Sequence, residues 1–172
     1  LSAAGRSMIE AMREQRVLLD LAHASQDTFW QALDAHGTDF PVIVSHTGVR
    51  AVHDSWRNLD DDQIRAIAAR DGVIGVMLHA GFLTSRWRTA TALDVARHID
   101  HVIRVGGERA AALGTDYDGF IVPPRDLRSV VELPRVSQAL LDLGHPPDRI
   151  VRVLGENALR PLRVMRPAPR QV

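Results

Sequence analysis

The hydrophobic residues of this chain are concentrated in four short runs rich in β-branched residues, with segments of helical periodicity between them. Within each run the apolar residues are almost continuous and do not alternate with polar ones. Continuous runs of this kind are typical of parallel strands that are buried on both faces. The predicted strands comprise residues 17–22, 41–45, 72–78 and 110–114.

Sequence signals for helix ends lie between the predicted strands. Ser25 is a good N-cap for a helix that ends at Gly37, and Asp60 forms a capping box with Gln63 before a helix that ends at Gly72. Helices in these positions are the usual crossovers of a parallel sheet. Two further helices are predicted, one from a capping box of Thr91 and Asp94 to Gly106 and one from Pro134 to Gly144.

The alternation of strands and helices predicts an α/β fold. Four βα units in series correspond to half of an eight-stranded (β/α) barrel or, alternatively, to a small open doubly wound sheet. With 172 residues, 45% of them apolar, the chain is long enough for one compact domain. We expect that domain to span residues 1–165, followed by a mobile, proline-rich tail over residues 166–172.

The composition narrows the classes of partner and cofactor. Basic and acidic residues both number 21, so no net charge draws the chain to nucleic acid or anionic lipid. Cysteine is absent, so a metal would need histidine and carboxylate ligands. No apolar run approaches the roughly 20 residues of a membrane-spanning helix, and a cytoplasmic location is favoured. Because the chain begins at Leu1 rather than methionine, we expect a signal or a longer segment upstream of it.

Residues with metal-binding and catalytic chemistry follow each predicted strand. His23, His46 and His79 follow the first three strands, and Asp116 and Asp118 follow the fourth. The carboxyl ends of parallel strands form the ligand-binding edge in both candidate folds, so we expect these side chains to converge. Neutral imidazole is the commonest nitrogen ligand of zinc, which makes His23 and His46 the leading metal ligands.

Other polar residues at this edge have more than one interpretation. Asp116 is either a metal ligand or a general base that binds a metal-activated water. Asp118 precedes Gly119, a pair common in turns, and is expected mainly to support the loop. Asp20 is expected to orient His23 or its loop. Arg57 either clamps a substrate carboxylate or is a solvated surface arginine. Histidines in predicted helices or their loops are expected on the surface, namely His36, His53, His98, His101 and His145.

In their order and spacing, the strand-end motifs resemble those of the membrane (renal) dipeptidase family of zinc metallopeptidases, a branch of the metal-dependent hydrolases. The resemblance covers about residues 1–165, with weaker similarity at residues 1–6 and 155–160. It is carried by Asp20-Leu21-Ala22-His23-Ala24-Ser25, Val44-Ser45-His46-Thr47, Trp56-Arg57-Asn58 and Gly114-Thr115-Asp116-Tyr117-Asp118-Gly119.

The resemblance implies the C-terminal half of a TIM-like (β/α)8 barrel with two zinc ions, which are bridged by a carboxylate and by a hydroxide that attacks a dipeptide. In that scheme His23 and His46 hold the second zinc ion. Asp116 deprotonates the bridging water and then protonates the leaving amine. Arg57 binds the C-terminal carboxylate of the substrate, which favours a dipeptidase over an endopeptidase.

Two parts of the family pattern differ in this chain. The His-x-Asp pair of the first zinc ion, the bridging glutamate and an oxyanion-stabilising histidine lie upstream of the residues present. His98-Ile99-Asp100 has the right spacing, but a helix directs its two side chains apart. The third strand ends in Met77-Leu78-His79 where the family commonly has Asn-Phe-Tyr, and Trp56 replaces a smaller or basic residue. His79 and Trp56 are therefore expected to alter the substrate pocket.

Three functional hypotheses follow. The leading one is a zinc-dependent dipeptidase for which this chain supplies half the site and the missing N-terminal half of the barrel supplies the rest. The second is a related metal-dependent hydrolase of a lactone or cyclic amide. The third is a non-catalytic barrel remnant, which the joint presence of His23, His46, Arg57 and Asp116 disfavours. A half barrel exposes strand edges and an apolar face, so we expect it to pair with its other half or with a second copy.

Overall fold

A computed structural model of the chain describes residues 1–166. The mobile tail predicted over residues 166–172 lies, apart from Arg166, outside the described residues. Among residues 1–166, no helix combines the length and the apolar character that crossing a membrane requires.

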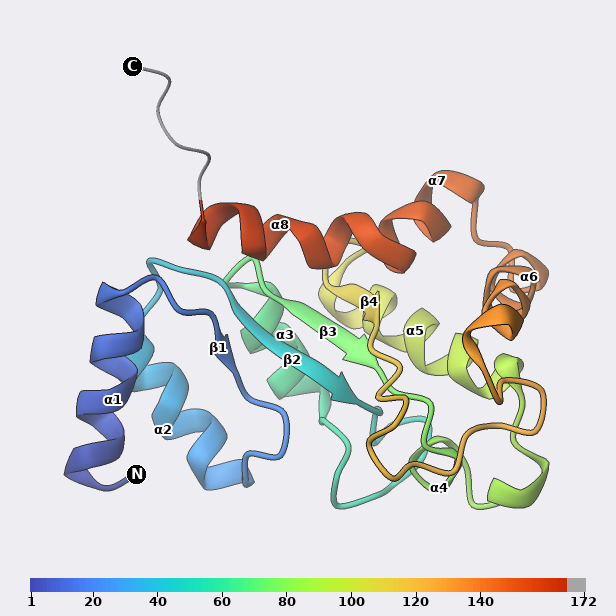
Figure 1. The fold of residues 1–172 in the computed structure, drawn as a ribbon, viewed down its shortest axis with the longest axis horizontal. Coiled ribbons are helices and arrows are strands. Elements are labelled where there is room, and N and C mark those ends of the chain that lie inside the picture. The colour runs from blue at the N-terminus through green and yellow to red at the C-terminus, as the bar shows by residue number, and fades with distance from the viewer. Residues whose placement is uncertain (167–172) are drawn as a thin grey trace.

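Strands and helices alternate through most of the chain, as the hydrophobic pattern predicts (Figure 1). The N-caps at Ser25 and Asp60 are confirmed, because their side chains accept hydrogen bonds from the backbone N–H groups of Thr28 and Gln63. The first helix was not among the predicted elements. The order is α1 Ala3–Glu14, β1 Leu19–Asp20, α2 Gln26–His36, β2 Val42–Thr47, α3 Asp61–Ala68, β3 Val73–Val76, α4 Ala80–Leu83, the 3-10 turn η1 Trp87–Thr89, α5 Ala92–Gly106, β4 Ala111–Leu113, the 3-10 turn η2 Val130–Glu132, α6 Pro134–Asp142, α7 Pro147–Val151, the π-helical turn η3 Arg152–Glu156 and α8 Asn157–Met165.

The four strands form a single parallel sheet in the order β1-β2-β3-β4. Each strand pairs with the next one along the chain, and right-handed crossovers then place all the connecting helices on the same face. Figure 1 shows α3 and α5 behind the sheet. A doubly wound sheet reverses its strand order and carries helices on both faces. The observed order is compatible with a (β/α) barrel and lacks the reversal of a doubly wound sheet.

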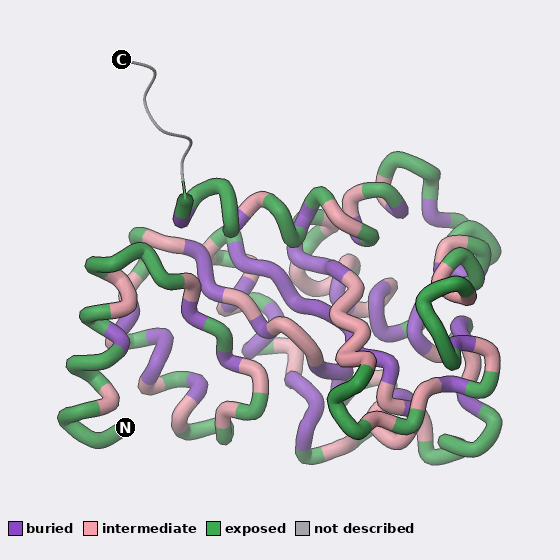
Figure 2. The backbone as a smooth tube through the Cα atoms, in the orientation of Figure 1, coloured by how far each residue is buried: buried purple, intermediate pink, exposed green. Residues whose placement is uncertain are grey.

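The face of the sheet opposite α3 and α5 is only partly covered. Helix α8 packs against β3 and β4 on this face and leaves a hollow of about 170 Å³ that is lined by Ile43, Gly75 and Leu162, among others. The expectation that every strand is buried on both faces is wrong for β1 and part of β2, because Asp20 is exposed and Ile43 is only partly buried (Figure 2).

Two residues fasten α8 near the amino ends of β3 and β4. Asn157 donates hydrogen bonds through Nδ2 to the carbonyl oxygens of Glu108 and Ala111, at 2.7 and 2.8 Å. Arg160 donates through Nη2 to the carbonyl oxygens of Gly72 and Arg109, at 3.4 and 2.8 Å. Because α8 is held at the amino ends of the strands, it leaves their carboxyl ends free to form a site.

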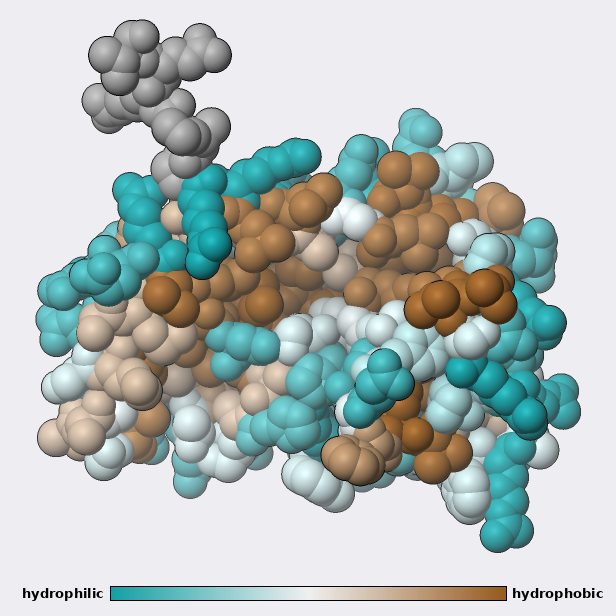
Figure 3. Space-filling view, in the orientation of Figure 1, coloured by the Kyte–Doolittle hydropathy of each residue, from teal (hydrophilic) through white to brown (hydrophobic). Residues whose placement is uncertain are grey.

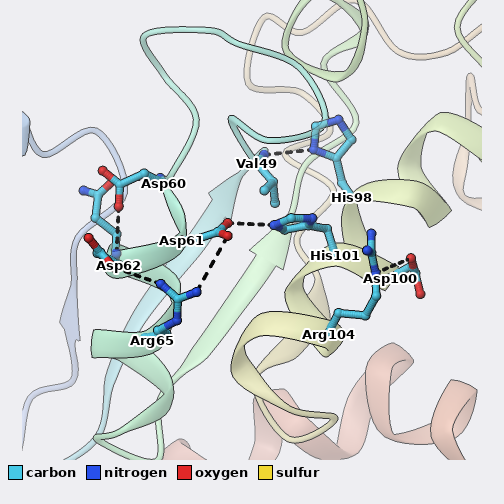
Figure 4. Close-up of polar contacts among 10 residues, drawn as sticks. Val49, Asp60, Asp61, Asp62, Arg65, His98, Asp100, His101 and Arg104 are labelled. Atoms are coloured by element: carbon cyan, nitrogen blue, oxygen red, sulfur yellow. Dashed lines mark hydrogen bonds and ion pairs between the residues drawn. The ribbon is translucent and has the colours of Figure 1, made fainter.

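The expectation that the helical histidines lie on the surface is wrong for His36, His98 and His145, which are buried. His98 of α5 accepts a hydrogen bond from the backbone N–H of Val49 at Nδ1 (Figure 4). It donates from Nε2 to the carbonyl oxygen of Leu83, and both distances are 2.9 Å. His101, one turn further along α5, pairs with Asp61 of α3 at 2.7 Å. These two side chains join α5 to the elements around it.

Candidate functional site

The carboxyl end of β2 is irregular, and the irregularity places His46. The pairing register between β2 and β3 shifts between Val44 and Thr47, which is the signature of a β-bulge. The carbonyl oxygen of Ser45 projects toward the neighbouring strands, where a Cβ atom would lie 2.0 Å from it on Gly75 and 1.9 Å from it on Gly114. Only glycine leaves room for this carbonyl at both positions, so the bulge depends on Gly75 of β3 and on Gly114, which directly follows β4.

The end of β1 is tied to the same bulge by Asp20. Its Oδ1 atom accepts hydrogen bonds from the backbone N–H groups of Ala22 and Ser45, both at 3.0 Å. His23 follows with a left-handed backbone, φ 66°, which is uncommon for a residue other than glycine. Asp20 therefore fixes the backbone that carries His23 relative to the backbone that carries His46.

The two histidine side chains face each other directly. Their Nε2 atoms are 2.8 Å apart, and the Nδ1 atom of His46 lies 2.8 Å from the hydroxyl oxygen of Ser45. If Nδ1 of His46 donates to that hydroxyl, its Nε2 atom carries a lone pair and becomes a ligand. Two Nε2 atoms at this distance can share one proton or one metal ion.

The histidine pair fits a partial zinc site. Two nitrogen ligands on one tetrahedral zinc ion are about 3.3 Å apart, given Zn–N distances of about 2.0–2.1 Å, so a small ring rotation would suffice. Within residues 1–166 no group of three or more histidine, aspartate or glutamate side chains is placed to hold a metal ion. The described residues thus offer two nitrogen donors, fewer than the three protein ligands of a catalytic zinc site.

Arg57 is buried beside this pair, with 8% of its surface exposed. Its guanidinium donates from Nη2 to the carbonyl oxygen of His46 at 3.0 Å, and its own carbonyl accepts from the hydroxyl of Thr47 at 3.2 Å. The interpretation of Arg57 as a solvated surface residue is therefore wrong. Within residues 1–166 most donors of this buried guanidinium are unused, which suits it to binding an anion.

The loop after β4 carries Asp116 and Asp118. Both have left-handed backbones, with φ angles of 58° and 65°. Asp118 is exposed, whereas Asp116 is partly buried and lies against Gly119, where a Cβ atom would be 2.3 Å from the Asp116 carboxylate. Tyr117 fastens the loop by donating its hydroxyl proton to the carbonyl oxygens of Leu127 and Ser129. Asp116 is thus held by a constrained loop whose glycine leaves room for the carboxylate.

His79 follows β3 and is fixed by the same loop. Its Nδ1 atom accepts a hydrogen bond from the backbone N–H of Val122 at 3.0 Å, which leaves the proton of the neutral ring on Nε2. The ring packs at 4.7 Å from that of Phe82, centroid to centroid. His79 therefore presents a donor and an apolar ring face at the carboxyl ends of the strands.

Electrostatics connect Asp116 to the other residues of this edge. Burial lowers the pKa of His46, and the negative charge of Asp116 opposes this shift. The pKa values of Arg57 and His79 are likewise lowered by burial and raised in part by Asp116. Asp116 thus lies close enough to all three side chains to influence their charge.

The structure brings His23, His46 and Arg57 into one contiguous group, with Asp116 and His79 along the neighbouring strand ends. Asp118 faces solvent, and the Asp20 carboxylate binds backbone N–H groups rather than the ring of His23. Sequence reasoning missed the hydrogen bond between Ser45 and His46, although the adjacency of the two residues offered a signal. It also missed the glycine pair beneath the bulge, for which the sequence gives no signal without the strand register.

Comparison with known proteins gives a consistent result. The family model described as membrane dipeptidase, peptidase family M19, matches residues 1–170. A dipeptidase of Aspergillus oryzae is 34% identical over 163 residues, which cover 94% of this chain and 38% of that protein. Two solved structures are each 28% identical to this chain. An amidohydrolase from Pseudomonas aeruginosa has a TM-score of 0.85 over 96% of this chain and 57% of its own. A Rhodobacter sphaeroides metallopeptidase liganded with a phosphinate mimic of the dipeptide L-Ala-D-Ala has a TM-score of 0.88 over 95% of this chain and 46% of its own.

Proposed function

Because the chain belongs to the membrane dipeptidase family, peptidase family M19, we propose that it is part of a zinc-dependent dipeptidase. The observation that carries this proposal is the pair of histidine Nε2 atoms 2.8 Å apart beside a buried arginine. The relative from R. sphaeroides holds a dipeptide mimic, which supports a dipeptide as the substrate class.

His23 and His46 are the metal ligands in this proposal. Zinc bound there would lower the pKa of a water molecule and polarise the peptide carbonyl. Ser45 keeps the His46 ring in the ligating tautomer, and Asp20 holds the backbone of both histidine segments together. Asp118 supports the loop that carries Asp116.

Arg57 binds the C-terminal carboxylate of the substrate. Its burial removes competing water, which strengthens a charge-assisted hydrogen bond to a carboxylate. Asp116 takes a proton from the attacking water and delivers it to the leaving amine. His79 contacts the substrate from the end of β3. The positive charge of Arg57 thus matches the terminal carboxylate of a short peptide, and the carboxylate of Asp116 matches its leaving amine.

The chain spans about half the length of the solved relatives, 57% and 46% of them. We propose that residues 1–165 are the C-terminal part of a (β/α)8 barrel and that its N-terminal part supplies the remaining ligands. Figure 3 shows apolar side chains gathered over α8 and the adjoining sheet. Leu159 and Leu162 of α8 are 45% and 49% exposed. An exposed apolar face of this kind is suited to binding a partner, which is either the other half of the barrel or a second copy of the chain.

A second candidate is hydrolysis of a lactone or cyclic amide. It is favoured by one observation, the structural similarity to an amidohydrolase at a TM-score of 0.85. Such a substrate has no terminal carboxylate, so it would make no use of the buried Arg57 guanidinium.

Replacing Arg57 by methionine separates the two candidates. In the full-length zinc-loaded enzyme, Arg57→Met should raise the KM for a dipeptide about 10- to 100-fold, because a charge-assisted hydrogen bond is lost, and should leave an uncharged lactone almost unaffected. Arg50→Met is the matched control, since Arg50 is exposed and pairs with Asp54. An unchanged dipeptide KM in Arg57→Met would refute the proposed role. A zinc-loaded wild-type enzyme that hydrolyses only the lactone would support the second candidate.

A further inference from the structure

Three aromatic rings form a continuous row at the carboxyl ends of the strands. The rings of Trp56 and Phe82 pack edge to face, with centroids 6.2 Å apart and an interplanar angle of 84°. Phe82 in turn contacts His79 at 4.7 Å. We call Trp56, Phe82 and His79 the aromatic row.

The aromatic row lies next to groups that have roles in the proposed reaction. At one end, His79 is near enough to Asp116 for that carboxylate to raise its pKa against the effect of burial. At the other end, Trp56 directly precedes Arg57 in the chain. The row therefore extends from the proton-transferring carboxylate to the neighbour of the carboxylate-binding arginine.

The loop that carries Trp56 is held in place from both sides. Asn58 donates through Nδ2 to the carbonyl oxygens of His53 and Phe82, at 2.9 and 2.8 Å. Asn58 itself is buried against Gly48. Because Asn58 ties the Trp56 loop to Phe82, the spacing of the row does not depend on the weak contact between the two rings alone.

Trp56 is 85% exposed, whereas Phe82 and His79 are partly buried. An indole offers a large, rigid apolar surface with little rotamer entropy to lose on binding. Here that surface is anchored at its base and open on its outer side. The arrangement is suited to receiving an apolar group from a ligand.

We propose that the aromatic row is a subsite for the side chain of the substrate's C-terminal residue, and that the enzyme prefers dipeptides in which this side chain is large and apolar. This inference rests on the proposed function. A dipeptide bound between Asp116 and Arg57 would lie along this row, because Asp116 influences His79 at one end and Trp56 directly precedes Arg57 at the other. The neutral His79 ring and Phe82 continue the apolar wall toward the peptide bond.

The test compares Gly-Phe, Gly-Leu and Gly-Gly as substrates of the full-length zinc-loaded enzyme. Burial of a phenyl or isobutyl group against the row should raise kcat/KM about 10- to 100-fold over Gly-Gly. Trp56→Ala should lower kcat/KM about tenfold more for Gly-Phe than for Gly-Gly, mainly through KM, and Phe82→Leu should act in the same direction. Trp30→Ala is the matched control, because Trp30 is half-exposed on α2 and packs on Phe29.

Zinc content and the unfolding temperature show whether Trp56→Ala or Phe82→Leu has lost its fold. If one of them has, the kinetics of the other variant decide the test. Equal kcat/KM values for the three dipeptides, or an equal loss for all three in Trp56→Ala, would overturn the subsite and leave the dipeptidase proposal intact. A zinc-loaded enzyme that hydrolyses none of the dipeptides would overturn the proposed function and the subsite with it.

Discussion

Two buried histidines in this chain have opposite surroundings. His36 and His98 are both 0% exposed. Both ring nitrogens of His98 are hydrogen-bonded to the backbone, whereas within residues 1–166 neither ring nitrogen of His36 has a partner. Burying a polar group costs free energy unless it is hydrogen-bonded, so the same substitution should have opposite effects at the two positions.

His98→Leu should destabilise the protein by about 2–4 kcal/mol at pH 7.5, since it leaves the Val49 N–H and the Leu83 carbonyl without their partner. Burial also lowers the pKa of His98 to about 4, from 6.5 in the unfolded chain. The unfolded state therefore binds the proton more readily, and this contribution to stability, present above pH 6.5, is lost as pH falls toward 4. It amounts to roughly 3 kcal/mol. Urea unfolding of wild type and variant at pH 7.5 and 5 measures both effects; a wild type equally stable at the two pH values would contradict this account.

His36→Leu should stabilise the protein by about 1 kcal/mol at pH 7.5, because an unpaired buried imidazole is replaced by an apolar side chain. The pKa of His36 is lowered by burial and by the charges of Arg13 and Arg70, which outweigh the opposing effects of the Gly37 backbone and Asp39. Protonation at low pH therefore disfavours the folded wild type. The gain should therefore be larger at pH 5. The same urea series checks this prediction, and a loss of stability in His36→Leu would show that the ring has a partner after all.

At the scale of elements, the bulge in β2, Gly75 of β3 and Gly114 directly after β4 form one unit. Gly114→Ala would place a Cβ atom 1.9 Å from the Ser45 carbonyl oxygen, which can move only if the bulge moves. We expect a loss of about 3 kcal/mol or more in stability and weaker zinc binding, because His46 is next to Ser45.

Gly155→Ala is the matched control for this substitution. Among residues 1–166, a Cβ atom on Gly155 meets nothing within 4 Å, and the residue lies in the helical segment before α8. Alanine should therefore stabilise the protein by about 0.5–1 kcal/mol. Thermal unfolding together with zinc titration measures both variants. Equal zinc affinity in Gly114→Ala and wild type would show that the bulge does not position His46.

The sequence predicts which strands and helices exist better than it predicts where they begin and end. The apolar runs predict all four strands, but β1 comprises only Leu19–Asp20 because its pairing with β2 is short. The capping signals at Ser25 and Asp60 are local, so they could be recognised without the fold. The burial of His36 and His98 depends on helix packing, and the left-handed backbones of His23 and Asp116 depend on the loops around them. Neither property can be derived from the pattern of residues alone.

At the scale of the whole molecule, two features support the proposal that the chain is part of a larger barrel. The strand order is that of a barrel, yet the sheet has four strands, and its inner face next to α8 is apolar and partly uncovered. The candidate metal site has the same character, because residues 1–166 offer a histidine pair and no third ligand beside it. In the proposed barrel, the N-terminal part would close the sheet and bring its metal ligands next to His23 and His46.

The metal content of the full-length protein tests this account most directly. Elemental analysis should find about two zinc ions per wild-type barrel. It should find about one in the double variant His23→Ala/His46→Ala, with dipeptide hydrolysis lost. His53→Ala should retain both ions, since His53 lies in the half-buried loop after β2 and has no place in the site. A wild-type protein without zinc, or a double variant that still holds two ions, would contradict the account.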